Sequence, residues 1–175
     1  MCSPVLQPVI RPVTTAEFDT WLAGAISAYA EDKVACGAWA AQAALEMSRA
    51  EHAQLLPLGK DTPDNHIHAI LNAAGRQVGL VWFALRQRGD SSIAYVYSID
   101  ILPTERRQGH ALRALRAVED EARRLGWAGI ALHVFGHNKA AQALYARLGY
   151  EPTNINLYKP LERDAELACA TASAR

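Results

Sequence analysis

The fold is decided by the stretch Ala94-Tyr-Val-Tyr-Ser-Ile-Asp-Ile-Leu-Pro103 and by the loop and amphipathic run that follow it. Its β-branched and aromatic residues alternate with polar ones, which predicts a strand. Pro103 ends that strand because proline cannot donate to a ladder. Apolar residues then recur at steps of three and four from Leu112 to Leu125, which predicts one buried helix face. Gly126 supplies a left-handed stop, so the unit is strand, glycine-bearing loop and helix.

The loop between this strand and helix predicts an anion-binding site. A helix N-terminus leaves backbone N–H groups unpaired and carries about half a positive charge. Gly109 and Ala111 are small enough for a phosphate to approach the backbone closely. Arg106, Arg107 and Arg113 surround this end, where each cation costs a few tenths of a kcal/mol to about 1 kcal/mol unless an anion is bound. A solvated basic loop is the alternative. The loop has neither the Gly-Lys-Ser/Thr of a P-loop nor the three glycines of a Rossmann fingerprint.

Two blocks of the sequence resemble the motifs of the GCN5-related N-acetyltransferase (GNAT) family, which uses acetyl-CoA. The first, Arg106-x-x-Gly109-x-Ala111, is similar to the family's Arg/Gln-x-x-Gly-x-Gly/Ala loop. The second, Asn138-x-x-Ala141-x-x-Leu-Tyr145-x-x-x-Gly-Tyr150, is similar to its Asn-x-x-Ala-x-x-Leu-Tyr-x-x-x-Gly-Phe/Tyr helix. The resemblance is close from about Ile93 to Leu161 and looser from Val9 to Leu85. It implies an α/β GNAT (acyl-CoA N-acyltransferase) fold, with a central mixed sheet of six or seven strands and helices on both faces.

Length and composition fit one domain with a sizeable core. The chain has 175 residues, of which 50% are hydrophobic, and its formal net charge is zero, so no nucleic-acid partner is expected. We expect a single domain over residues 1–163 and a frayed tail over 164–175. Cys2, Cys36 and Cys169 are too scattered for a disulfide framework or a zinc site. With no apolar run of 18 residues and no signal peptide, a cytoplasmic protein without membrane contact is expected.

The pattern along the chain predicts the order βααβββαβα. The expected elements are a strand over 5–14, a helix that begins at Thr14 or Thr15 and breaks at 31–33, a helix over 37–55, a hairpin of 66–72 and 77–86, the strand over 95–102, a strand over 129–135 and the helix after Asn138. Only 151–161 remains for the C-terminal strands of the family. We therefore expect one strand over 154–159, an open sheet edge, and a homodimer through that edge as an alternative to a monomer.

The resemblance implies a set of cofactor-binding residues. Acetyl-CoA would lie between the strands 95–102 and 129–135, where backbone groups of Ile101 and Leu102 hold the pantetheine arm. The pyrophosphate would be held by the loop, and the later helix would meet the pantetheine and the sulfur. The implied residues are Arg106, Arg107, Gln108, Gly109, His110, Ala111, Leu112, Asn138, Ala141 and Tyr145. Asn138 is also expected to cap its helix.

Acyl transfer to an amine needs a neutral amine, a donor for the developing oxyanion and help for the departing thiolate. Tyr145 is the predicted group for the thiolate, although full proton transfer from a phenol of pKa ~10 to a thiolate of pKa ~8.5 is uphill by roughly 2 kcal/mol. A core tyrosine is the alternative. Asp100 is the predicted base, with a water chain as the alternative. Tyr97 can share its face only if a bulge lies between them. His66 and His68 have metal-ligand spacing but no third ligand, so no metal is predicted.

The acceptor pocket in the family is built from the first two helices and nearby strand ends. The implied residues here are Tyr29, Glu31, Asp32, Trp39, Trp82 and Tyr97. Acidic and aromatic side chains suit a small cationic amine, although Trp39 and Trp82 fit a core equally well. The predicted function is transfer of an acetyl group to a primary amine of a small molecule, without a covalent enzyme intermediate. A protein N-terminus or lysine as acceptor, and a non-catalytic acetyl-CoA-binding module, are the alternatives.

Overall fold

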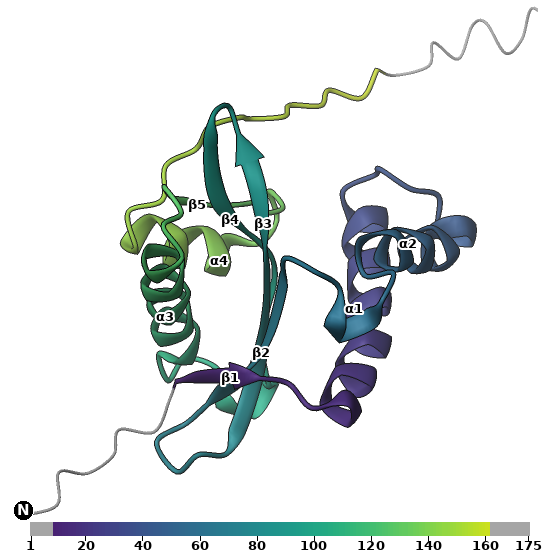
Figure 1. Ribbon diagram of the computed structural model, residues 1–175. Helices are drawn as coiled ribbons and strands as arrows, with labels where there is room; N and C mark the ends of the chain where they lie inside the picture. The colour runs from purple at the N-terminus through teal and green to yellow at the C-terminus, as the bar shows by residue number, and fades with distance from the viewer. Residues whose placement is uncertain (1–8, 162–175) are drawn as a thin grey trace, which may run out of the picture.

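The computed structural model describes residues 9–161 of the chain. The elements follow the predicted order (Figure 1). They are β1 (Ile10–Pro12), α1 (Thr15–Ala35), α2 (Ala41–Leu55), β2 (Asn65–Leu71), β3 (Gln77–Arg88), β4 (Ser91–Ile101), α3 (His110–Arg124), β5 (Ile130–Leu132) and α4 (Lys139–Arg147), with short 3-10 turns at Gly59–Asp61 and Pro103–Glu105. Among these residues no helix combines the length and apolarity needed to cross a bilayer.

The strands form one mixed sheet in the order β1-β2-β3-β4-β5. The first four strands are antiparallel to their neighbours, and β5 joins β4 in parallel after the crossover through α3. Helices α1 and α2 cover one face and α3 and α4 the other (Figure 1). The layered α/β fold with helices on both faces is therefore confirmed.

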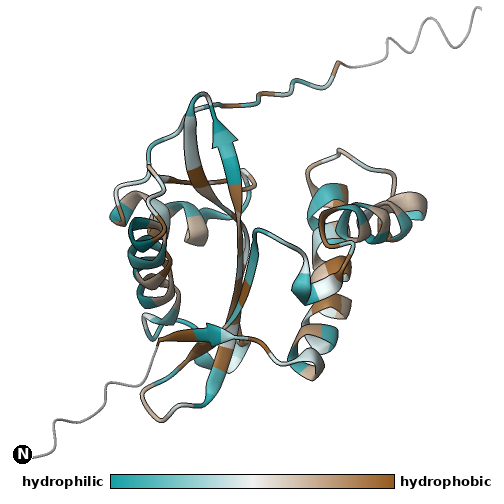
Figure 2. Ribbon diagram, in the orientation of Figure 1, coloured by the Kyte–Doolittle hydropathy of each residue, from teal (hydrophilic) through white to brown (hydrophobic). Residues whose placement is uncertain are grey.

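Each face of the sheet has its own apolar core. On the α3 face, Phe83, Val96 and Leu115 belong to one cluster, and on the α1 face Phe18 and Trp82 belong to another. Figure 2 shows hydrophobic residues along the central strands and polar residues on much of the helices' outer surfaces. Burial of both faces explains the nearly continuous apolar run in β3.

A bulge in β4 changes which residues face which core. Trp82 pairs with Ser98 while the next residue, Phe83, pairs with Val96, so Tyr97 is the extra residue. Before the bulge Val96 packs on the α3 face, and after it Ile99 and Ile101 do. The even-numbered positions that follow are thereby turned to the α1 face. Tyr97 and Asp100 are three positions apart and can face the same side of the sheet only if a bulge lies between them. That predicted bulge is confirmed.

The first helix is longer and the second shorter than predicted. A capping box between Thr14 and Glu17 starts α1, and the helix continues through 31–33, so the predicted break there is wrong. Glu and Lys are good helix formers, and a charged run interrupts the apolar stripe without ending a helix. Gly37, at φ +74°, closes the turn after α1, and α2 begins only at Ala41.

The strand predicted over 154–159 is wrong. This segment carries no strand, and its side chains are exposed. The sheet has five strands in the described part of the chain, not six or seven, and β5 spans three residues where 129–135 was predicted. A strand needs a partner to satisfy its backbone, and alternation alone does not supply one.

Candidate active site

The two parallel strands part shortly after they meet. Pairing of β4 with β5 ends at Val96 and Leu132, while β4 continues to Ile101. The N–H of Leu102 donates to the carbonyl oxygen of Val78 at 2.9 Å, toward β3. Because peptide groups alternate along a strand, those of Ile99 and Ile101 face the opposite side, where β5 has left the sheet. The opening is therefore lined by backbone groups that no strand of the described chain uses.

These hydrogen bonds distinguish the two residues predicted to hold the pantetheine arm. Ile101 points its N–H into the opening, and its carbonyl oxygen accepts from Nε of Arg106 at 3.0 Å. Leu102 has a partner for both backbone groups, because its carbonyl oxygen accepts from the N–H of Glu105 at 2.8 Å. In this structure the backbone of Ile99 and the N–H of Ile101, rather than the backbone of Leu102, are free for a ligand.

The loop before α3 presents a run of free N–H groups. Among residues 9–161, no hydrogen-bond acceptor is found for the backbone N–H of any residue from Arg107 through Leu112. Arg107 at φ +62° and Gly109 at φ +79° are both left-handed, and such residues next to right-handed ones make successive N–H groups converge into an anion-binding concavity. Arg107 is strained in this conformation because it carries a Cβ. Free N–H groups in this arrangement suit a phosphate group, and the binding of one by this loop stays a prediction.

The side chain of His110, the first residue of α3, is buried next to this loop. The ring is buried, and Nη2 of Arg113 donates to its Nδ1 at 2.6 Å. Because a guanidinium can only donate, Nδ1 is the acceptor and a neutral ring carries its proton on Nε2. That proton faces Oε2 of Glu105 at 3.7 Å, and Glu105 also pairs with Arg76. The ring of His110 therefore points into the protein, and the group of His110 that stays free for a ligand is its backbone N–H.

The second motif starts α4 at the mouth of the opening. Oδ1 of Asn138 accepts the N–H of Ala141 at 3.1 Å, which confirms that Asn138 is the N-cap. Nε2 of Gln142 donates to the carbonyl oxygens of Phe135 and Gly136 and so ties the preceding loop to the helix. The positions of Asn138 and Ala141 are therefore set by helix capping, and contact of either residue with a cofactor stays a prediction.

Tyr145 lies on the inner side of α4, packed against the core of the α3 face. Burial raises the pKa of its phenol, and the negative charge of Asp100 raises it further. The phenol therefore stays protonated at neutral pH and can donate a hydrogen bond.

Asp100 lies on the α1 side of β4, beyond the bulge. Its Oδ2 accepts from Nε1 of Trp21 at 3.4 Å and from Oγ of Ser98 at 2.5 Å, and the carboxylate is exposed. Tyr97 stacks on Trp82 with ring centroids 4.4 Å apart. The bulge thus places Tyr97 and Asp100 on the same face, as a shared site requires.

The other predicted acceptor residues divide into two groups. Tyr29 and Trp39 pack edge to face and both contact the ammonium of Lys33, at 5.1 and 5.0 Å from the ring centroids. A cation from the chain itself therefore occupies this aromatic pair. Trp82 is 2% exposed and donates from Nε1 to Asn65, so it belongs to the core, the alternative left open above. Glu31 is exposed on α1 and makes no described side-chain contact.

Asp32 joins two parts of the site that are far apart in sequence. Its Oδ1 lies 2.9 Å from Nε2 of His137, which belongs to the loop between β5 and α4. This contact links α1, on one face of the sheet, to the loop that leads into α4 on the other face. The structure adds His137, Trp21 and Ile99 to the candidate residues, and no local pattern could have found the first two because each depends on a contact across the fold.

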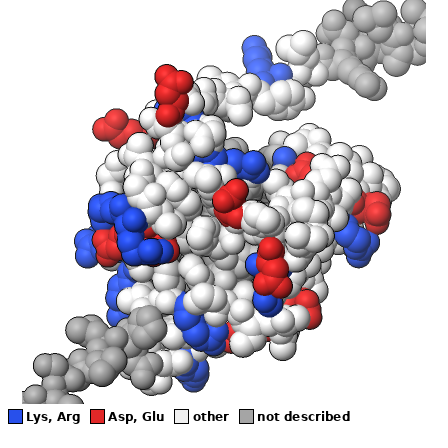
Figure 3. All heavy atoms as spheres, viewed as in Figure 1, with Lys and Arg blue, Asp and Glu red and all other residues white. Residues whose placement is uncertain are grey.

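The histidines of β2 are packing residues. His66 stacks on Phe83 at 4.9 Å, and burial lowers the pKa of both His66 and His68. In the described part of the chain no group of three or more potential ligands lies close enough together to hold a metal ion. Acidic and basic side chains are interspersed on the face seen in Figure 3, in keeping with a formal net charge of zero.

Comparisons with known proteins agree with this geometry. The model of the acetyltransferase (GNAT) family matches residues 37–150. The chain is 31% identical over 153 residues to the uncharacterized N-acetyltransferase YycN of Bacillus subtilis (strain 168), covering 87% of this chain and 98% of that one. It is 30% identical over 152 residues to the uncharacterized N-acetyltransferase YdgE of the same organism, covering 87% and 97%.

Solved structures show the same relationship. The crystal structure of the putative acetyltransferase YycN from Bacillus subtilis superposes with a TM-score of 0.83 at 31% identity, over 88% of this chain and 98% of that one. A putative acetyl transferase from Pyrococcus furiosus shares the fold, with a TM-score of 0.63 at 22% identity over 87% and 99%. By the match of the family model and of relatives along most of their length, the chain belongs to the GNAT family of acetyltransferases.

Proposed function

We propose that this acetyltransferase moves an acetyl group from acetyl-CoA to the primary amine of a small molecule, by direct attack within a ternary complex. The observation that carries the proposal is the run of unpartnered N–H groups from Arg107 through Leu112 beside the opening between β4 and β5. A diphosphate bound there would also accept from Arg106 and Arg107, whose charges are otherwise unfavourable at a helix N-terminus.

The rest of coenzyme A would lie in the opening between β4 and β5. From the diphosphate, a pantetheine arm would run along the unpaired edge of β4, where the backbone of Ile99 and Ile101 can pair with its amides. The thioester supplies the acetyl group, and its position would fall between Tyr145 on one side and Asp100 on the other. Hydrogen bonds between the pantetheine amides and the backbone of β4 would require no rearrangement, because β4 and β5 are already apart at this point.

Two side chains of this site have roles in the transfer. The acceptor ammonium, with a pKa near 10, must lose a proton before it can attack, and Asp100 is placed to receive that proton directly or through water. Tyr145 donates a hydrogen bond to the sulfur as the carbon–sulfur bond breaks. Because its pKa is raised, the phenol is a stronger candidate for hydrogen bonding than for early proton transfer.

A small cationic amine fits the acceptor side best. Trp21 presents aromatic surface next to the carboxylate of Asp100, a combination that attracts an ammonium group. The guanidinium of Arg86 lies over the ring of Tyr97, 5.4 Å from the centroid, and adds a positive charge at the far side. An acceptor with one amine therefore fits better than a polyamine.

The experiment is a thiol-release assay on the purified chain with acetyl-CoA. Monoamines, amino acids, aminoglycosides, polyamines and basic peptides would each be tested as acceptors, and product masses would confirm N-acetylation. We expect turnover of a small monoamine. Rapid turnover of a basic peptide with none of the small amines would replace the small-molecule acceptor with a protein acceptor. Tight binding of acetyl-CoA without any turnover would support a non-catalytic module instead.

A further inference from the structure

The guanidinium group of Arg113 is held at the N-terminal end of α3. Arg113 is the fourth residue of the helix, and its N–H donates to the carbonyl oxygen of Gly109 at 3.1 Å. Side chains of a helix lean toward the helix N-terminus and cover the preceding turn. Nη2 of Arg113 accordingly reaches Nδ1 of His110, the first helical residue, at 2.6 Å. The charge of Arg113 therefore lies at the turn that carries the free N–H groups.

Most N–H donors of Arg113 have no acceptor in the described part of the chain. A guanidinium group has five such donors, and within residues 9–161 the contact with His110 is the one side-chain hydrogen bond that Arg113 makes. The carboxylate on the other side of the His110 ring, that of Glu105, pairs with Arg76. Because Arg113 is also exposed, its remaining donors are available to an anionic ligand.

His110 holds this guanidinium in one place. The His110 side chain is 5% exposed, and its Nε2 lies 3.7 Å from Oε2 of Glu105, so the ring sits between a carboxylate and the guanidinium of Arg113. An arginine side chain loses much rotamer freedom when it binds a ligand. Contact with a buried ring removes part of that freedom beforehand, which favours binding.

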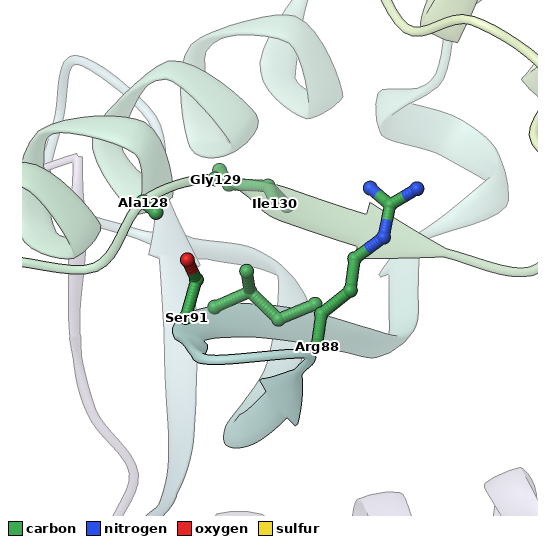
Figure 4. Close-up of a pocket in the computed structure, with 6 residues that line it drawn as sticks. Arg88, Ser91, Ala128, Gly129 and Ile130 are labelled. Atoms are coloured by element: carbon green, nitrogen blue, oxygen red, sulfur yellow. The ribbon is translucent and has the colours of Figure 1, made fainter.

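The arginine next to a cavity at β5 provides a contrast. Arg88 borders a cavity of about 280 Å³ together with Ser91 and the first residues of β5, as Figure 4 shows. No helix N-terminus lines that cavity, and no side chain among residues 9–161 forms a hydrogen bond with the guanidinium of Arg88. Arg113 has both features, so its position suits an anion better than that of Arg88.

We propose that Arg113 is a further ligand of the coenzyme A diphosphate and that His110 is the residue that positions it. Nη2 of Arg113 stays on Nδ1 of His110, while the free N–H groups of the guanidinium donate to a phosphoryl oxygen. A held side chain is thereby added to the backbone N–H groups and to the loop arginines Arg106 and Arg107. The inference rests on the proposed function, because it requires coenzyme A to be the ligand of this loop.

Titration calorimetry of the full chain tests the role of Arg113. Arg113→Gln is expected to weaken binding of coenzyme A about 10- to 100-fold and to leave binding of pantetheine, which has no diphosphate, unchanged. The matched control is Arg116→Gln, which removes the same charge from an exposed position one turn further along α3 and is expected to bind coenzyme A within about 2-fold of the wild type. Equal affinity of Arg113→Gln and the wild type, or equal weakening by both variants, overturns the inference and leaves the proposed function in place. A wild type that binds no coenzyme A overturns both.

Three substitutions of His110 test its positioning role. His110→Leu removes the acceptor for Arg113, and coenzyme A affinity is expected to fall about 5- to 10-fold. His110→Asn is expected to restore it, because Oδ1 of asparagine takes the place of Nδ1, whereas His110→Gln places its amide nearer to the position of Nε2 and is expected to bind as weakly as His110→Leu. Thermal unfolding reports the stability of each variant, and the comparison of asparagine with glutamine decides even where His110→Leu is unstable.

A double variant shows whether His110 acts through Arg113. Arg113→Gln combined with His110→Leu is expected to bind coenzyme A as weakly as Arg113→Gln alone, since there is no longer a guanidinium group to position. Additive losses in the double variant, or an asparagine variant no better than the glutamine variant, overturn the positioning role of His110.

Discussion

Replacement of Gly109 tests whether the loop geometry is what binds coenzyme A. Gly109 is left-handed at φ +79°, and an added Cβ would meet nothing within 4 Å, so the strain of Gly109→Ala is purely in the backbone. That strain is about 1 kcal/mol, equivalent to a fall of about 2–4 °C in Tm for a chain of this size. The alanine can relieve it only by leaving the left-handed region, which rotates the amides on either side away from their neighbours.

The same rotation gives the expected loss of affinity. One hydrogen bond to a charged group contributes about 1.5–3 kcal/mol, so loss of one diphosphate contact weakens coenzyme A binding about 10- to 100-fold. The assay is titration calorimetry with coenzyme A, alongside thermal unfolding of the free protein.

Gly126 provides the matched control at the other end of α3. Its φ is +73°, and an added Cβ would also meet nothing within 4 Å. Gly126→Ala is therefore expected to lose the same stability as Gly109→Ala while binding coenzyme A as tightly as the wild type. Equal affinities of the two variants for coenzyme A would refute the reasoning, whether both were weakened or neither was.

Three further predictions concern single side chains. Tyr145→Phe is expected to leave acetyl-CoA affinity within about 2-fold and to lower kcat about 100-fold or more, measured by calorimetry and thiol release; an unchanged kcat would make Tyr145 a core residue. Asp100→Asn is expected to lower kcat/KM about 100-fold at neutral pH and to recover as pH rises and the free amine accumulates, whereas a fall of less than about 3-fold would favour a water chain as base. The third concerns stability: burial, with a smaller effect of His66, lowers the pKa of His68 from 6.5 to about 4. Between these values the unfolded chain binds a proton that the folded chain does not, so unfolding free energy falls as pH falls from 6.5 to 4, by on the order of 2 kcal/mol. His68→Leu should flatten that part of a denaturation series, and an unchanged pH dependence would contradict the assignment.

The strand–loop–helix unit could be predicted because every local signal in it agrees. The strand pattern before Pro103, the left-handed glycines and the periodicity of α3 all point to the same structure. The bulge at Tyr97 could also be anticipated, because Asp100 and Tyr97 have opposite parity and cannot otherwise share a face. The N-cap role of Asn138 likewise depends only on its place before a helix.

The parts that could not be predicted depend on contacts between distant residues. Trp21 and Asp100 are separated by 79 positions, and His137 and Asp32 by 105. Tyr29 and Trp39 were predicted to contact the acceptor. In the structure the ammonium group of Lys33 lies over both rings, and this contact exists only in the folded chain. The segment over 154–159 alternates like a strand, but a strand forms only where an edge receives it, and the sequence does not say which edge.

The central claim is that the amides from Arg107 through Leu112 bind the diphosphate of coenzyme A. The most direct test is a titration of the ¹⁵N-labelled chain followed by amide chemical shifts, with coenzyme A in one series and pantetheine, which lacks the diphosphate, in the other. The account predicts large shifts at these amides with coenzyme A and none with pantetheine, while Ile101 responds to both. Amides from Arg107 through Leu112 that stay unmoved at saturating coenzyme A would contradict it.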